Sequence, residues 1–384
     1  MLEALYYKTI DQKQKLQDYF NNIEKEINAD EIKKVYNTYE YKQEKQSKIF
    51  ASVDGSFNKK KYMACFIYAL SSQTIISKPK EGIIKESAAA EIDQISTIQA
   101  GNIDRILSRY MDILELKSTI DTLKKHPEID YMLLDGSIGG KLSNFRLDDR
   151  KIEKYTNLLI GLSRTITSEN LEKDEIDLSI DSITKKEDII NRIKKENPLN
   201  TTEIDKLETN LINYYSGLEE LICIAYLLEN YKEKIICVSK TSSTTRLYHK
   251  SIPDAAVLEY YSKNTFYTDA TSEEHGPIRL FYQNNMTQRI PVKFPILDNQ
   301  LRRLNYTTTF TRFKYNRNVI KIELPYKVDN NKLEKILNEL NTSNIEGYPY
   351  ILEKAHNEVV IKQKDMDAII NRIEINEKTG RDML

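Results

Sequence analysis

The chain has 384 residues, of which 30% are charged and 40% are apolar, as in an ordinary globular protein. Its 57 basic and 58 acidic residues nearly cancel, so any contact with nucleic acid must come from a local basic surface. No apolar run approaches the length of a membrane span, and the N-terminus lacks the apolar core of a signal peptide. We therefore expect a cytoplasmic protein with no membrane contact.

The first part of the chain changes from a helical to a strand pattern. Residues 1–47 predict a charged N-terminal helical segment. The stretches "KIFASVDGSF" from Lys48 and "KYMACFIYALSS" from Lys61 are apolar, aromatic and β-branched, which predicts strands. Helical spacing returns at residues 102–126, and "YMLLD" from Tyr131 has the near-continuous apolar run of a strand that is buried on both faces.

The middle of the chain contains a segment of different composition. Residues 165–210 are polar and highly charged, and we interpret them as a partly helical insertion that adds nothing to the main core. Residues 208–232 predict an apolar helix, and "KIICVSK" from Lys234 predicts another buried strand. The three cysteines, Cys65, Cys223 and Cys237, form no close pair of the kind that binds zinc, so we interpret them as small buried residues.

The C-terminal part predicts strands followed by helices. The strand-like stretches are "PIRLFYQN" from Pro277, "TRFKYNRN" from Thr311 and "VIKIELPY" from Val319. Two helices follow at residues 330–341 and 349–374, the second with Pro349 as its first helical residue, before a tail at 375–384. The mixture of strands and helices predicts an α/β fold with a mixed sheet flanked by helices, in one main domain at residues 48–374.

Two Asp-Gly-Ser motifs follow buried strands. Asp54 and Asp135 each come directly after an apolar run, and side chains at strand ends converge on a crevice. Two neighbouring aspartates repel each other unless a divalent cation such as Mg²⁺ or Mn²⁺ neutralises them. The alternative is that each Asp-Gly pair marks a hairpin turn.

A polar stripe lies on the helix predicted between the two motifs. Its members are spaced by three and four residues and share one face: Asp104, Ser108, Asp112, Glu115, Thr119 and Thr122. Since no Lys or Arg falls on this stripe, it either faces a cation or forms a narrow solvent-exposed edge. Two strand-end aspartates and a helix glutamate are the arrangement of ribonuclease-H-like nucleases, in which two metal ions about 4 Å apart flank the scissile phosphate.

The C-terminal stretch "GYPYILEKAHNEVVI" carries one histidine. His356 shares a helix face with Leu352, Val359 and Val360. It is therefore either a histidine of the core or, as a neutral imidazole, a metal ligand or proton shuttle.

The order of these motifs resembles a known family. The sequence carries a strand with Asp-Gly-Ser, a helix glutamate, a strand with Leu-Asp-Gly-Ser, a strand ending in Ser-Lys, and a C-terminal Tyr-Pro and Ala-His. Over residues 48–370, this ordered set is similar to the NurA nucleases of archaea and some bacteria. The charged insertion at 165–210 has no match in the family pattern.

The resemblance implies a role for six residues of this chain. It implies three metal-binding carboxylates, an active-site histidine that also binds metal, a functional tyrosine and a lysine at the phosphate: Asp54, Glu115, Asp135, His356, Tyr348 and Lys240. Asp112 lies one turn from Glu115 and is an alternative helix ligand, and Lys240 is alternatively a surface lysine at a strand end.

The resemblance also implies a fold, an activity and partners. It implies a ribonuclease-H-like fold whose site is completed by a C-terminal helix. The implied activity is that of a DNA nuclease dependent on Mn²⁺ (or Mg²⁺), with two bound ions, that acts as a single-strand endonuclease and a 5′-to-3′ exonuclease. Such proteins form homodimers and work with the hexameric HerA-type ATPase in DNA end resection.

A basic and aromatic stretch from Leu301 predicts a surface for single-stranded DNA. Cations that contact phosphates alternate there with rings that stack on bases. The candidate DNA-binding residues are Arg302, Arg303, Arg312, Phe313, Lys314 and Tyr315. The alternative is an amphipathic hairpin whose basic residues face water.

The sequence is also compatible with two other functions. Actin-like and sugar-kinase-like phosphotransferases also begin with a strand that ends in Asp-Gly, although the Gly-Ser spacing fits their phosphate loops poorly. A non-catalytic adaptor on a ring translocase would keep the Asp-Gly-Ser motifs as turns.

Overall fold

The computed structural model describes residues 2–25, 29–42, 44–98, 102–144, 147, 151–274, 282–283, 286–287 and 305–374. The helices are α1 (Leu2–Lys25), α2 (Ala29–Lys33), α3 (Ile103–Lys125), α4 (Ile138–Asn144), α5 (Thr156–Ser163), α6 (Glu169–Glu172), α7 (Asp181–Thr184), α8 (Lys186–Glu196), α9 (Thr201–Tyr231), α10 (Asp254–Tyr261), α12 (Asn330–Asn341), α13 (Tyr350–Val359) and α14 (Gln363–Ile373). The strands are β1 (Tyr36–Thr38), β2 (Phe50–Lys61), β3 (Cys65–Lys78), β4 (Gly82–Ser96), β5 (Tyr131–Asp135), β6 (Ile235–Ser239), β7 (Phe266–Thr268), β8 (Thr271–Glu274), β9 (Tyr282–Gln283), β10 (Met286–Thr287), β11 (Asn305–Arg312), β12 (Ile320–Leu324), β13 (Asn344–Ile345) and β14 (Tyr348–Pro349).

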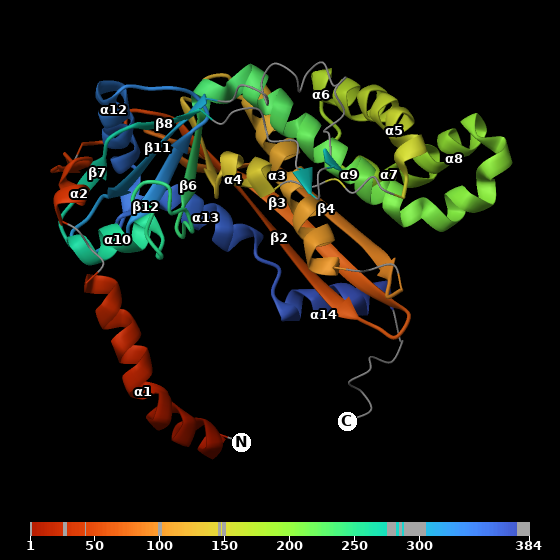
Figure 1. Ribbon diagram of the computed structural model, residues 1–384. Helices are drawn as coiled ribbons and strands as arrows, with labels where there is room; N and C mark the ends of the chain where they lie inside the picture. Colours follow the sequence, from red (N-terminus) through yellow and green to blue (C-terminus); the bar gives the residue numbers. More distant parts are fainter. Residues whose placement is uncertain are drawn as a thin grey trace.

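A mixed sheet of ten strands, counted over the described residues, forms the centre of the fold (Figure 1). The strand order is β1-β7-β11-β12-β6-β5-β2-β3-β4, and β8 pairs with β11. Strands β2, β5 and β6 run parallel, whereas β3 and β12 run antiparallel to their neighbours. The expected α/β class, with a mixed sheet flanked by helices, is confirmed.

The central strands are buried on both faces, as their apolar runs predict. In β5, Met132 belongs to the cluster beneath α3 and α9, whereas Leu133 points to the opposite cluster with α12 and α13. The same alternation occurs in β6, where Ile235 and Ile236 belong to the two different clusters. Successive strand residues point to opposite faces, so a fully covered strand must be apolar throughout.

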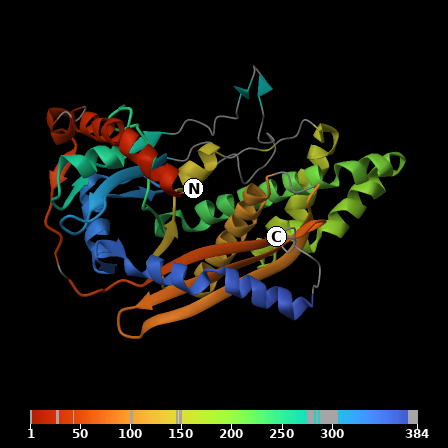
Figure 2. The same ribbon diagram turned by 90° about the horizontal axis from the view of Figure 1, so that it is seen from below.

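Helices cover the two faces of the sheet unequally. Helices α3 and α9 cross one face together, and the region of helices α5 to α8 extends beyond it (Figure 1). On the other face, α13 packs on β2 and β3 and α14 continues along β2 (Figure 2). The C-terminal helices therefore return to the strand that carries the first Asp-Gly-Ser motif.

Strand β4 has no counterpart among the predicted elements. Its sequence, GIIKESAAAEIDQIS, contains three alanines and many polar residues, which are weak strand formers. It nevertheless pairs with β3 from Cys65↔Ser96 to Lys78↔Gly82. The long neighbouring strand, rather than local propensity, determines its conformation.

The prediction that residues 165–210 stay outside the main core is wrong. Leu171, Ile189 and Ile193 are fully buried and belong to the same apolar cluster as β5, β6 and α9. Helix α8 explains the error, because its three isoleucines lie on one face of an otherwise charged helix. The following helix α9 begins at Thr201, seven residues before the predicted start at 208.

The C-terminal predictions need two corrections. The predicted helix at 349–374 is broken into α13 and α14, and Pro349 is a strand residue that precedes the helix. The β-branched run at 359–361 is a poor helix former and lies at the break. The stretch "TRFKYNRN" is mostly a turn after β11, with Asn316 at a φ of 55°.

The N-terminal segment is only partly helical. Helix α1 projects from the body of the molecule (Figure 1), whereas β1 pairs with β7 at one edge of the sheet. Residues 36–38 within the predicted helical segment 1–47 are therefore a strand. Over the described residues, no helix is both long and apolar enough to cross a membrane.

Candidate active site

The two aspartates of the Asp-Gly-Ser motifs lie side by side in the sheet. Strands β2 and β5 are parallel and in register up to Val53↔Leu134, so Asp54 and Asp135 are the next residues on adjacent strands. Neighbouring strands lie about 4.8 Å apart, which brings the two carboxylates to one place. Strand β2 continues to Lys61, so the first motif lies within a strand and is neither a strand end nor a hairpin turn.

Asp54 is bonded to His356. The His356 Nδ1 lies 2.7 Å from Asp54 Oδ2. Burial raises the pKa of Asp54 above its ordinary value, although His356 opposes this shift. The His356 side chain is 54% exposed, so the core interpretation of this histidine is wrong. Helix α13 instead brings an accessible imidazole to the first aspartate.

Glu115 lies against the backbone of the first motif. A Cβ atom at Gly55 would come within 2.7 Å of a Glu115 carboxylate oxygen, so only glycine allows this approach. Glu115 and Asp135 line the same cavity. Burial raises the pKa of Glu115 to about 8; Lys141 opposes this shift, and Asp54 and Asp135 add to it.

A lysine that the sequence analysis did not identify faces the acidic stripe. Lys141, on α4, donates a hydrogen bond to Asp112 and lies 3.7 Å from Glu115 Oε2. Burial lowers the pKa of Lys141, but the two carboxylates outweigh this effect and raise it. The stripe therefore faces Lys141, a cation of the chain itself. The C-terminal part of the stripe does not form a solvent-exposed edge, because Thr119 and Thr122 are fully buried.

Lys240 and Tyr348 lie on the other side of Asp135. The Lys240 ammonium lies 3.7 Å from Asp135 Oδ2 and 4.6 Å from the centre of the Tyr348 ring. Among the described residues the buried Tyr348 hydroxyl has no hydrogen-bond partner. Burial, together with the charges of Asp135 and Asp54, raises the pKa of this tyrosine. The structure thus brings together all six residues that the family resemblance implies.

The donor set fits a hard divalent cation. Three carboxylates and one imidazole supply oxygen and nitrogen ligands, and the raised pKa values of Asp54 and Glu115 indicate negative charge that a cation would stabilise. As the side chains stand, each carboxylate faces a cationic or imidazole group of the chain: His356, Lys240 or Lys141. Within the described residues, no three His, Cys, Asp or Glu side chains are already arranged around one point as a metal cage.

The predicted DNA-binding stretch is only partly on the surface. Arg312 is fully buried and binds Glu259 and backbone carbonyls, while Phe313 packs in the core, so neither lines a surface groove. Lys314 and Tyr315 are exposed, and Lys314 pairs with Glu346. Arg302 and Arg303 lie outside the described residues. The error has a simple cause, since β11 is buried on both faces and Arg312 pairs there with Glu259 of α10.

The fold and site define an α/β protein with a carboxylate cluster at the centre of a mixed sheet. The family model described as the NurA domain matches residues 48–361. The chain belongs to the NurA family, and the expected resemblance is confirmed.

Curated relatives cover most of the chain. A protein of Sulfurisphaera tokodaii, "DNA double-strand break repair nuclease NurA", is 26% identical over 94% of this chain and 90% of its own length. A protein of Methanocaldococcus jannaschii, "Probable DNA double-strand break repair nuclease NurA", is 27% identical over 87% of this chain and 80% of its own length.

Solved structures share the fold. The NurA nuclease from Sulfolobus solfataricus matches with a TM-score of 0.71 at 20% identity, over 97% of each chain. A crystal structure of NurA bound to dAMP and manganese matches with a TM-score of 0.67 at 17% identity, over 97% of this chain and 98% of that one.

Proposed function

We propose that this chain is a divalent-metal-dependent DNA nuclease that hydrolyses phosphodiester bonds. The observation that carries the proposal is the register of β2 and β5, which sets Asp54 and Asp135 side by side with Glu115 against Gly55. The names of the curated relatives support the same activity.

Four side chains would hold the metal. Asp54, Asp135 and Glu115 supply oxygen ligands and His356 supplies nitrogen, a set suited to Mn²⁺ or Mg²⁺, and we propose two ions. When bound, such ions lower the pKa of water and neutralise charge on the phosphate. The manganese in the NurA structure with dAMP supports Mn²⁺ as the cofactor.

Lys240 and His356 have roles that follow from their contacts. The half-exposed Lys240 ammonium can exchange Asp135 for a phosphate oxygen of DNA, with which it forms a charge-assisted hydrogen bond. The Nδ1 of His356 is held by Asp54, which leaves Nε2 of this exposed ring as the nitrogen that would bind the metal. The Tyr348 ring packs against the Lys240 ammonium and lies within the electrostatic influence of both aspartates.

We propose that the sheet is ribonuclease-H-like. The support is that one aspartate lies on a central strand, the second on its parallel neighbour and the glutamate on the helix that crosses between them. The C-terminal helix α13 supplies His356 and completes the site. The same proposal includes the mode of cleavage. We expect endonucleolytic cleavage of single strands and exonucleolytic cleavage in the 5′-to-3′ direction.

We also propose a homodimer that works with a hexameric HerA-type ATPase in DNA end resection in the cytoplasm. The projecting helix α1 supports a protein partner, because several of its large apolar side chains are more than half exposed. These side chains are Leu5, Tyr6, Tyr7, Ile10, Leu16 and Tyr19.

The activity is tested with purified protein and end-labelled single-stranded DNA. Cleavage is expected with Mn²⁺, and none is expected in EDTA or with Asp54→Asn or Asp135→Asn. Asp104→Asn is the matched control, since this aspartate lies on α3 but pairs with Lys59 at the surface. Cleavage that persists in EDTA or in the Asp54→Asn variant would contradict the proposal.

A further inference from the structure

The serine that ends each Asp-Gly-Ser motif has no part in the chemistry proposed above. Ser56 and Ser137 each follow a site aspartate by two residues, and both are only partly exposed. Each of them makes a hydrogen bond to a segment from the last quarter of the chain. The serine that recurs in the two motifs therefore makes the same kind of contact in both.

Ser56 binds the segment that follows the His356 helix. Its hydroxyl oxygen accepts a hydrogen bond from the Ile361 N–H at 3.0 Å. Asn58, two residues further along β2, donates to the Ile361 carbonyl at 3.1 Å. Since Ile361 lies immediately beyond α13, these bonds fix the end of the helix that carries His356 to the strand that carries Asp54.

Ser137 binds a buried glutamate on β12. Its hydroxyl donates to Glu323 Oε2 at 2.5 Å, and its oxygen accepts from the Gly140 N–H at 2.9 Å. The other oxygen of Glu323 accepts from the Gly139 N–H at 2.8 Å. Glu323 is only 2% exposed, so its charge depends on these donors and on Lys321, 3.3 Å away.

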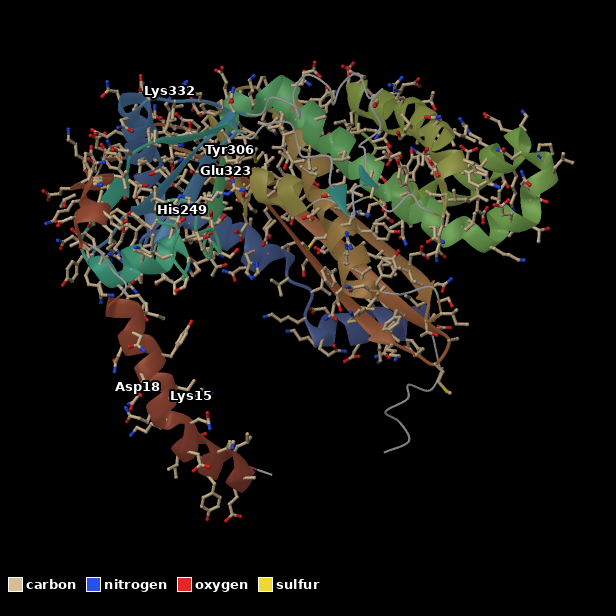
Figure 3. All side chains as sticks on the ribbon, viewed as in Figure 1. Lys15, Asp18, His249, Tyr306, Glu323 and Lys332 are labelled. Carbon is tan, nitrogen blue, oxygen red and sulfur yellow. The ribbon has the colours of Figure 1, made fainter. Side chains whose placement is uncertain are left out.

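The backbone around the second motif has little freedom. Gly136 has a φ of 99°, which favours glycine, and its carbonyl accepts a hydrogen bond from Ser239. A Cβ atom at Gly139 would come within 2.9 Å of the Tyr306 ring. Figure 3 shows Tyr306 and Glu323 close together beside α4. The turn after Asp135 is thus held by β11 and β12, which lie far away in sequence.

We infer that Ser56 and Ser137 are positioning residues that tie the two metal-binding aspartates to the C-terminal segments that complete the site. Ser56 holds His356 against Asp54. Ser137, through Glu323, fixes the direction of the backbone turn that follows Asp135 at the end of β5. This inference rests on the proposed metal-dependent nuclease. Residues that orient metal ligands typically change metal affinity by about 10- to 100-fold when they are replaced.

The test measures Mn²⁺ binding without DNA, by electron paramagnetic resonance of free Mn²⁺ during titration. Ser56→Ala and Ser137→Ala are each expected to weaken Mn²⁺ binding by about tenfold or more. Ser56→Thr and Ser137→Thr keep the hydroxyl and should restore most of the affinity. Glu323→Ala should have a larger effect than Ser137→Ala, because it also removes the acceptor of the Gly139 N–H.

Ser216→Ala is the matched control. In the part of the chain that the structure describes, this buried serine bonds within α9, to the Asn213 carbonyl, so its loss should leave Mn²⁺ affinity unchanged. Urea unfolding midpoints of the two motif variants should shift no more than that of the control, which separates positioning from a general loss of stability.

The outcomes distinguish the inference from the proposed function. Mn²⁺ affinities within twofold of wild type in both Ser→Ala variants would overturn the inference while leaving the nuclease proposal intact. Weakened binding that the threonine variants do not restore would also overturn it. A wild-type protein that binds no Mn²⁺ would overturn the proposed function and the inference together.

Discussion

Helix α3 carries two clusters of charge that differ in kind although they lie two residues apart. One is centred on Lys117, which binds Asp181 and Glu219 in the interior. The other contains Glu115, which lies against the first Asp-Gly-Ser motif. Comparison of the two shows how a structural charge cluster differs from a functional one.

The Lys117 cluster satisfies its own charges. All three side chains are fully buried. Asp181 also accepts from Thr167 and Lys185, and Glu219 accepts two backbone N–H groups at the start of α7. Burial raises the pKa of Asp181, but Lys117, Lys185 and Thr167 together outweigh this effect and the net shift is downward, whereas burial keeps the pKa of Glu219 above its ordinary value against the pull of Lys117. The cluster therefore fastens the 165–210 region to α3 and α9.

The Glu115 cluster leaves its charges poorly balanced. The pKa values of Asp54 and Glu115 are both raised by burial, and neighbouring carboxylates add to these shifts. Perturbed carboxylates with accessible partners are typical of functional sites. The Lys117 cluster is therefore structural, whereas the Glu115 cluster has the features of a functional site.

The largest effect is expected from Glu115→Gln. Loss of this carboxylate should reduce Mn²⁺-dependent cleavage by more than about a hundredfold, beyond the loss typical of an outer-sphere residue. Because it also removes a buried charge next to Asp54, the free energy of unfolding in EDTA should not fall at pH 8. Cleavage assays and urea unfolding check the two statements. A strongly destabilised Glu115→Gln variant would contradict the claim that the charge of Glu115 is poorly balanced in the folded protein.

Lys117→Met should have the opposite profile. Leaving Asp181 and Glu219 buried without their cation should cost about 3–5 kcal/mol of unfolding free energy. Cleavage per folded molecule should change only a few-fold. Arg192→Met, on α8, is the control, because the Arg192 side chain is 48% exposed, its partner Asp188 is 51% exposed, and such a surface pair is worth less than about 1 kcal/mol. Equal destabilisation by the two variants would contradict the assigned role of Lys117.

The pH dependence of stability in EDTA sharpens the contrast further. The folded pKa of Glu115, about 8, lies above its ordinary value of 4.5, so the folded state retains a proton that the unfolded chain loses. Relative to Glu115→Gln, wild type should therefore lose stability as the pH rises from 4.5 to 8, with no further loss above that. Parallel pH profiles of the two proteins in denaturant titrations would refute this assignment.

The smallest effect is expected at the surface. Lys314 and Glu346 are each 53% exposed, so Lys314→Ala should cost less than about 1 kcal/mol of stability. If Lys314 contacts a phosphate, this variant should also reduce the slope of DNA affinity against salt by about one unit. An unchanged slope would exclude Lys314 from the DNA-binding surface.

Local sequence was sufficient for the elements that form the site. The apolar runs before Asp54 and Asp135 predicted buried strands, and the spacing on α3 placed Glu115 on a polar face. The order of motifs then predicted the family, which the comparisons confirmed. Each single motif lies within a few residues, whereas their order extends over residues 48–370.

Features that depend on distant partners could not be predicted. Lys141 and Glu323 look like ordinary charged residues, and only the fold brings them to Glu115 and Ser137. Arg312 resembled a surface cation because Glu259, the partner that it meets in the interior, lies 53 residues away in the sequence. Glu323 could have been suspected only as a lone acid within the apolar strand β12.

The most direct test of the central claim is a crystal soaked in Mn²⁺ and measured at an anomalous wavelength. The account predicts at least one anomalous peak coordinated by the carboxylates of Asp54 and Asp135, with Glu115 as a further ligand. Peaks only at other positions, or no peak beside these two aspartates, would contradict it.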